Sequence, residues 1–184
     1  MTGRPPRMEP PREVVESYTL SPEPQQTDER TEPMFTEVLH FERTWAHEAG
    51  STAKVLAALT EASLGQRVAE GHRTLGELAW HVVVSPKVIL ATVGLEVDGP
   101  TKEDPMPASL EGVRRTHAAS SSAVATAVRT TWTDDGLRET VEFYGMRVPR
   151  GVVLAVTLFH EIHHRGQMIV LMRQAGLAVP KVYG

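Results

Sequence analysis

The stretch that decides the fold is Phe159-His160-Glu161-Ile162-His163-His164-Arg165-Gly166-Gln167. Two of its histidines, His160 and His164, are four residues apart and therefore lie one turn apart on the same side of a helix. Imidazoles in that arrangement can bind one metal ion. The residues from His160 to His164 also match the pattern H-E-x-x-H, in which a glutamate acts as general base for a metal-bound water.

The neighbours of this histidine pair indicate that it faces the protein interior. At 100° per residue, the aliphatic Val153 and Leu171 fall within about 40° of His160, as does His164. His163 lies about 60° to the other side, so it ranks behind the pair as a ligand. Residues 151–174 are apolar over most of the helix circumference, which is typical of a central bundle helix or of one that also meets a partner subunit.

A second helical segment supplies a third histidine. It begins at Thr74, an N-cap residue with Glu77 as its capping-box partner. His81 follows Leu78 by three residues and faces inward with it. Pro86 is expected to kink or interrupt this helix. Three inward histidines from two helices make a site that keeps a position open for water or substrate. Neutral imidazole suits Zn²⁺, Ni²⁺, Cu²⁺ or Fe²⁺, and the sequence does not choose among them.

The composition excludes several classes of site and partner. The chain of 184 residues contains no cysteine, which excludes disulfides, thiolate zinc sites and cysteine nucleophiles. Acidic side chains outnumber basic ones by 23 to 19, so no net positive field attracts nucleic acid. No apolar run reaches the roughly 20 residues of a membrane span, and the N-terminal stretch has no signal-peptide core. We therefore expect a soluble, cytoplasmic protein with neither nucleic acid nor membrane as a partner.

The chain divides near residue 33. Residues 1–33 hold seven of the thirteen prolines and few apolar side chains, which predicts a disordered, proline-rich tail. Residues 34–184 are long enough for one domain with a buried core. The domain is therefore expected to carry both histidine segments.

Four segments of this domain have helical periodicity and predict an all-α fold, a four-helix bundle. They span about residues 35–59, 74–85, 109–132 and 151–174. Residues 141–149 alternate weakly between apolar and polar side chains, and we expect a short ribbon or loop there rather than a sheet. The interior of such a bundle is a usual place for a metal held by side chains of facing helices.

Several other polar residues have ordinary explanations. A lone histidine on an apolar helix face usually bonds a backbone carbonyl, so His117 ranks as a pocket-lining residue rather than a ligand. Glu161 is either catalytic or a solvated neighbour of His160. Three further histidines lie on a polar helix face or in a loop and are expected at the surface: His40, His47 and His72.

The two histidine-bearing segments resemble the DinB-like superfamily of damage-inducible and thiol-dependent transferase proteins. The resemblance is carried by the 159–167 stretch quoted above and by Thr74-Leu75-Gly76-Glu77-Leu78-Ala79-Trp80-His81. Weaker similarity lies in Val141-Glu142-Phe143 with Gly145, and in the closing Gly176-Leu177, Pro180 and Tyr183-Gly184. It covers about residues 34–184 and leaves the tail unexplained.

The resemblance implies a four-helix bundle, often a homodimer, in which His81, His160 and His164 bind one divalent ion, with Zn²⁺ or Ni²⁺ expected first. It also implies an S-transferase or isomerase that acts on a small-molecule substrate with a low-molecular-weight thiol such as bacillithiol, mycothiol or glutathione. A metal with an open site lowers the pKa of a bound thiol. Arg165 is then a candidate for steering an anionic thiol, for capping the helix or for contacting a partner subunit.

Two other functions stay open. A metal-dependent hydrolase would use Glu161 as its base, although the protease form is disfavoured because no histidine or carboxylate side chain follows His164 to supply a third ligand. A non-catalytic stress-response protein would close its metal site with a fourth protein ligand, for which His117 and His163 are the candidates. The number of ligands and a pocket beside the metal would decide between these functions.

Overall fold

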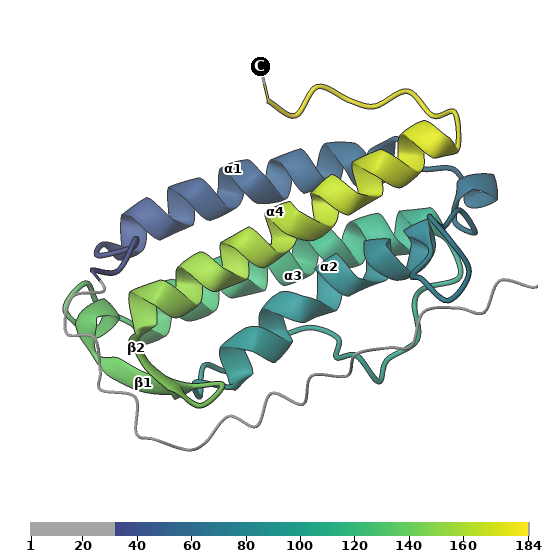
Figure 1. The fold of residues 1–184 in the computed structure, drawn as a ribbon. Helices are drawn as coiled ribbons and strands as arrows, with labels where there is room; N and C mark the ends of the chain where they lie inside the picture. Colours follow the sequence, from purple (N-terminus) through teal and green to yellow (C-terminus); the bar gives the residue numbers. More distant parts are fainter. Residues whose placement is uncertain (1–31, 184) are drawn as a thin grey trace, which may run out of the picture.

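The fold is a bundle of four helices with a small hairpin at one end (Figure 1). A computed structural model describes residues 32–183. The predicted all-α bundle is confirmed, whereas the predicted tail falls almost wholly on residues 1–31, outside the described residues. The helices are α1 (Val38–Ala57), α2 (Leu75–Ala91), α3 (Leu110–Thr131) and α4 (Arg150–Gln174), with the short 3-10 helices η1 (Glu61–Ser63) and η2 (Gly136–Arg138).

Local sequence signals account for the start of α2. The Thr74 hydroxyl accepts a hydrogen bond from the Glu77 N–H at 3.1 Å, and the Glu77 carboxylate accepts one from the Thr74 N–H at 2.6 Å, which is the predicted capping box. The prediction that Pro86 interrupts the helix is wrong, because α2 continues through this residue. Proline removes one backbone hydrogen bond, and the buried Ile89 and Leu90 hold the following turn in the core.

Between α3 and α4 the chain forms an antiparallel hairpin, which corrects the expectation of a ribbon or loop without a sheet. Strand β1 (Thr140–Phe143) pairs with strand β2 (Met146–Pro149). The two linking residues, Tyr144 and Gly145, both have positive φ angles, of 47° and 79°. Such turns match the twist of paired strands. In strands of only four residues, apolar and polar side chains alternate too briefly for the sequence to reveal the pairing. The geometry of the turn therefore decides whether the two strands pair.

One long connection gives the bundle its topology. Residues 92–109 run back beside α2, where the Trp80 indole donates to the Asp104 carbonyl at 3.0 Å and the Lys87 ammonium donates to the Gly99 carbonyl at 2.6 Å. Helices α2 and α3 therefore run in the same direction, antiparallel to α1 and α4 (Figure 1). The most extensive helix packing joins α2 to α4. The two helices that carry the predicted ligands thus lie side by side.

Two apolar clusters fill the interior, one toward the hairpin and one toward the opposite end. Large, fully buried members include Phe35, Phe41, Trp45 and Leu154 in the first cluster, and Leu56, Leu75, Met168 and Met172 in the second. Helix α4 contributes to both, as its broadly apolar sequence predicted. Among the described residues, no helix combines the length and the hydropathy that a membrane span requires.

Candidate metal centre

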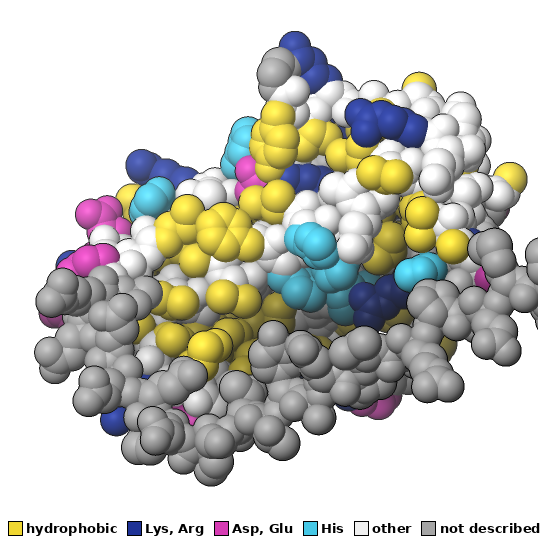
Figure 2. Space-filling model, viewed as in Figure 1, with side chains coloured by type: hydrophobic (Ala, Val, Ile, Leu, Met, Phe, Trp, Pro, Cys, Tyr) yellow, Lys and Arg dark blue, Asp and Glu magenta, His cyan; other side chains and the backbone are white. Residues whose placement is uncertain are grey.

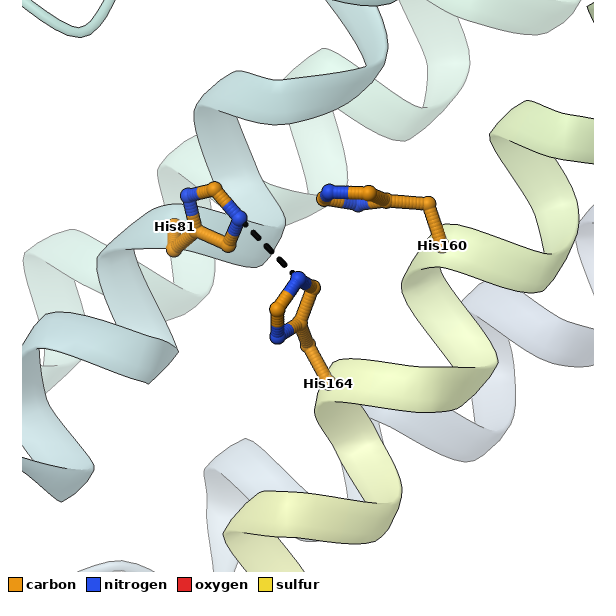
Figure 3. Close-up of side chains that lie close together, drawn as sticks. All are labelled: His81, His160 and His164. Carbon is orange, nitrogen blue, oxygen red and sulfur yellow. Dashed lines mark hydrogen bonds between the residues drawn. The ribbon is translucent and has the colours of Figure 1, made fainter. Parts of the chain in front are cut away.

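Three histidines from two helices meet where α2 packs against α4 (Figure 3). His81 comes from α2, and His160 and His164 come from α4. One ring nitrogen of each lies within 4.8 Å of the others. The His160 ring centroid is 5.0 Å from that of His81 and 4.4 Å from that of His164. The structure thus brings together the three residues predicted as ligands, and their binding of a metal stays a prediction.

The spacing of the nitrogen atoms fits a metal ion. His81 Nε2 and His164 Nε2 are 3.1 Å apart (Figure 3). Two imidazoles that bind Zn²⁺ at tetrahedral angles and the usual bond lengths hold their nitrogens about 3.3 Å apart. Two unprotonated nitrogens at this distance repel each other unless a proton or a cation lies between them. The observed separation is therefore close to that of two ligands of one ion.

Neighbouring side chains orient two of the rings. His164 Nδ1 is 2.7 Å from Gln167 Oε1, which can only accept, so Nδ1 carries the proton and Nε2 keeps its lone pair. Ser85 Oγ donates to the His81 carbonyl at 2.6 Å and lies 3.2 Å from Nδ1 and 3.3 Å from Nε2 of the His81 ring. Its oxygen can accept a proton from either ring nitrogen, which leaves the other nitrogen for a metal. Such partners are usual around metal-binding histidines.

Burial keeps the three imidazoles neutral. It lowers the pKa of His81 to about 4, and the charges of Arg73 and the neighbouring histidines add to this effect. It lowers the pKa of His160 to about 4 as well, with the neighbouring histidines as the next causes. Burial also lowers the pKa of His164, against an opposing hydrogen bond with Gln167. Because metals bind neutral imidazole, the cluster is in its binding form at neutral pH.

The remaining candidates for the metal shell lie outside the cluster. His163 is exposed and accepts a hydrogen bond from Gln167 at 3.0 Å. Glu161 is only 1% exposed and lies with one carboxylate oxygen 3.6 Å from Nε2 of the buried His117. Its expected role as a solvated neighbour is wrong, because the position after His160 points about 100° away from it, into the bundle. Neither oxygen of Glu161 has a hydrogen-bond partner among the described residues.

Arg165 also points away from the cluster, which corrects the three roles considered for it. Its guanidinium is 1% exposed and donates to the Glu48 carboxylate, the Glu48 carbonyl (2.9 Å), the Thr52 hydroxyl (3.3 Å) and the Tyr183 hydroxyl. Burial raises the pKa of Glu48, but hydrogen bonds from Tyr183 and Arg165 outweigh burial and hold that pKa below its ordinary value. Arg165 therefore ties α4 to α1 and to the C-terminal segment.

A pocket of about 350 Å³ opens beside His164. Figure 2 shows histidine side chains gathered in a hollow of the surface with a basic side chain next to them. The predicted surface histidines His40, His47 and His72 are all exposed, and His72 lines this pocket. Sequence reasoning missed Arg73, because a loop residue carries no periodicity that would place it near α4. Among the residues that the structure describes, the pocket is lined by Val68, His72, Arg73, Leu78, His164, Gln167, Val170 and Leu171.

Comparison with known proteins shows which family this chain resembles. The model of the DinB family matches residues 34–184. The protein YrdA of Bacillus subtilis (strain 168) is 40% identical over 151 residues, which are 82% of this chain and 90% of that protein. A crystal structure of a DinB-like protein from Bacillus cereus ATCC 10987 matches with a TM-score of 0.76 and 42% identity, over 82% of this chain and 100% of that one. The DinB-like protein YjoA of Bacillus subtilis shares the fold, with a TM-score of 0.61 at 16% identity over 78% of this chain and 97% of its own.

Proposed function

Since the chain belongs to the DinB family, we propose that it is a metal-dependent transferase that attaches a low-molecular-weight thiol to a small electrophile. The observation that carries this proposal is the group of three histidines whose ring nitrogens lie within 4.8 Å of one another, next to a pocket. Three protein ligands leave a coordination position for a substrate, which is the pattern of catalytic sites.

The residues of the cluster fit the chemistry that a metal ion would supply. His81, His160 and His164 would hold a divalent ion, Zn²⁺ or Ni²⁺ before others, and the ion would lower the pKa of a bound thiol so that thiolate is available at neutral pH. The chain has no cysteine, so the sulfur comes from the cosubstrate. Gln167 and Ser85 orient the imidazoles, and the apolar wall of the pocket excludes water from part of the cosubstrate. The sulfur bonds to the electrophilic carbon as the leaving group departs with its electron pair, and the thiol proton passes to solvent.

The alternatives have less support. A hydrolase needs Glu161 in contact with water, and this carboxylate is 1% exposed and faces His117. A closed, non-catalytic site needs a fourth protein ligand. Among the described residues the cluster has three members and includes neither His117 nor His163. An open site beside a pocket favours turnover.

A homodimer is part of this proposal. Two large apolar side chains of α4 that lie outside the pocket are exposed, namely Val156 (36%) and Phe159 (51%), and they lie within about 60° of each other around the helix. A second copy of the chain would bury them. Analytical ultracentrifugation should give twice the chain mass of 20.2 kDa, and Phe159→Ser should shift the equilibrium toward monomer. A wild-type protein that sediments as a monomer at micromolar concentration would remove this part of the proposal.

The transferase activity is tested by conjugation of a thiol to monochlorobimane. The full chain, purified without a tag and loaded with Zn²⁺ or Ni²⁺, is offered bacillithiol, mycothiol or glutathione, and the fluorescent conjugate is followed. We expect the loaded protein to accelerate conjugation of one of these thiols at least about 100-fold over the metal-free protein. This factor is at the lower end of the rate effects of general acid–base catalysis and of electrostatic stabilisation.

Two variants separate catalysis from a background reaction. His160→Ala should remove the acceleration, whereas His47→Ala, an exposed histidine on α1, should leave it unchanged. If metal-loaded wild-type protein accelerates none of the three thiols, the transferase proposal fails, although the metal site can still stand.

A further inference from the structure

The pocket beside His164 is lined by a cationic residue and by no acidic one among the described residues. The cation is Arg73, which comes from the loop before α2, while the opposite wall is formed by α4. Val68, Leu78, Val170 and Leu171 are the apolar residues of the pocket lining. This combination of one charged group with apolar walls is typical of a site that orients a small anionic ligand.

Arg73 is available for a ligand. Its guanidinium forms no hydrogen bond or ion pair in the part of the chain that the structure describes, whereas the nearby Arg67 pairs with Glu70 at 3.6 Å. The carboxylate of Glu77, another acid near this loop, is already an acceptor for the Thr74 N–H at 2.6 Å. A guanidinium that forms no hydrogen bond or ion pair with the described residues, in the lining of a largely apolar pocket, can accommodate an external anion.

Arg73 and His164 line the same pocket, and His164 belongs to the histidine cluster. A small molecule that occupies the pocket can therefore place an anionic group against Arg73 and another atom at the histidine cluster. The pocket volume of about 350 Å³ is at the small end of ligand sites and admits a compact metabolite rather than a folded partner.

We propose that Arg73 is the carboxylate-binding residue of this pocket, and that the preferred cosubstrate is a thiol whose carboxylate pairs with Arg73 while its sulfur reaches the three histidines. Guanidinium suits this role because its planar fork matches both carboxylate oxygens. The proposal depends on the proposed thiol chemistry and deepens it, since it names the class of thiol. Arg73 orients the molecule and takes no part in bond formation, so it is a positioning residue.

The test is a binding titration with two matched thiols, N-acetylcysteine and N-acetylcysteine amide, which differ in the carboxylate alone. The full chain is loaded with Co²⁺, and the absorption band of a cobalt-bound thiolate reports binding without any turnover. We expect wild-type protein to bind the carboxylate form about tenfold more tightly than the amide, the size of one charge-assisted hydrogen-bonded contact. Arg73→Gln should lose this preference and keep its affinity for the amide and its cobalt content.

Two controls make the outcome specific. Arg73→Lys should keep part of the preference, since the charge remains without the fork. Arg67→Gln removes a charge from the same loop but not from the pocket lining, and should bind both thiols as wild type does. A preference that survives in Arg73→Gln overturns this proposal and leaves the thiol chemistry standing. Wild-type protein that binds cobalt but neither thiol overturns both.

Discussion

Replacement of His164 by alanine should abolish stoichiometric metal binding. His164 Nε2 is 3.1 Å from His81 Nε2, and the three rings are the only group of potential ligands found among the described residues. Loss of a residue that merely orients a ligand costs 10- to 100-fold in metal affinity, and loss of a ligand should cost more than about 100-fold. Elemental analysis of tag-free protein and calorimetric titration with Zn²⁺ or Ni²⁺ measure this directly, and His81→Ala and His160→Ala should behave alike.

The matched control for this substitution is His163→Ala. His163 neighbours His164 on the same helix but is exposed and lies outside the cluster. The variant should retain one metal per chain. Loss of metal in His163→Ala together with retention in His81→Ala would show that the ion is held by α4 alone, and the three-histidine site would then be wrong.

The pH dependence of metal binding follows from the same cluster. Protons compete with the ion for the ring nitrogens only below the pKa of the metal-free histidines, and burial lowers that pKa to about 4 for His81 and His160. The metal affinity should thus change little from pH 8 to pH 6 and fall steeply near pH 4. Ordinary histidines, with a pKa near 6.5, would already lose affinity from about pH 7 downward.

The second large effect is expected from Arg165→Met, which should destabilise the fold by about 3–5 kcal/mol. The substitution leaves the Glu48 carboxylate, 7% exposed, without its charged partner. It also removes the bonds that join α4 to Thr52 and to Tyr183. Urea denaturation followed by circular dichroism measures the loss, which is a large part of the 5–15 kcal/mol total typical of a domain.

Two further variants test the cause. Glu48→Met combined with Arg165→Met removes both charges and should recover much of the stability, because apolar side chains can replace a buried pair. Tyr183→Phe removes one hydroxyl and should cost only about 1 kcal/mol. An Arg165→Met protein that unfolds at the wild-type urea concentration would contradict a stabilising role for this pair.

The histidine cluster and the contacts of Arg165 lie on different faces of α4. His164 and Arg165 are adjacent in the sequence, but successive helix positions point 100° apart. One side chain therefore joins the histidine cluster against α2, and the next ties the helix to α1 and Tyr183. The H-E-I-H-H-R run from His160 to Arg165 thus places the histidine cluster and the stabilising arginine on different faces of one helix.

Interactions over a few residues were visible in the sequence. The capping box of Thr74 and Glu77, the helical periodicity of the four segments and the pairing of His160 with His164 on one face all arise within one or two turns. Backbone geometry alone relates such positions. For that reason the bundle, the pair of His160 and His164 on one face and the inward position of His81 on its own helix could be predicted without knowledge of the packing.

Only the tertiary structure decided which distant residues meet. It brought His81 to His164 across α2 and α4, joined Arg165 to Glu48 across 117 residues, and placed the loop residue Arg73 at the mouth of the pocket. It also paired the two short strands around Tyr144 and Gly145. These contacts depend on how whole helices and loops pack, and a periodic pattern records which face of an element is buried but not what that face touches.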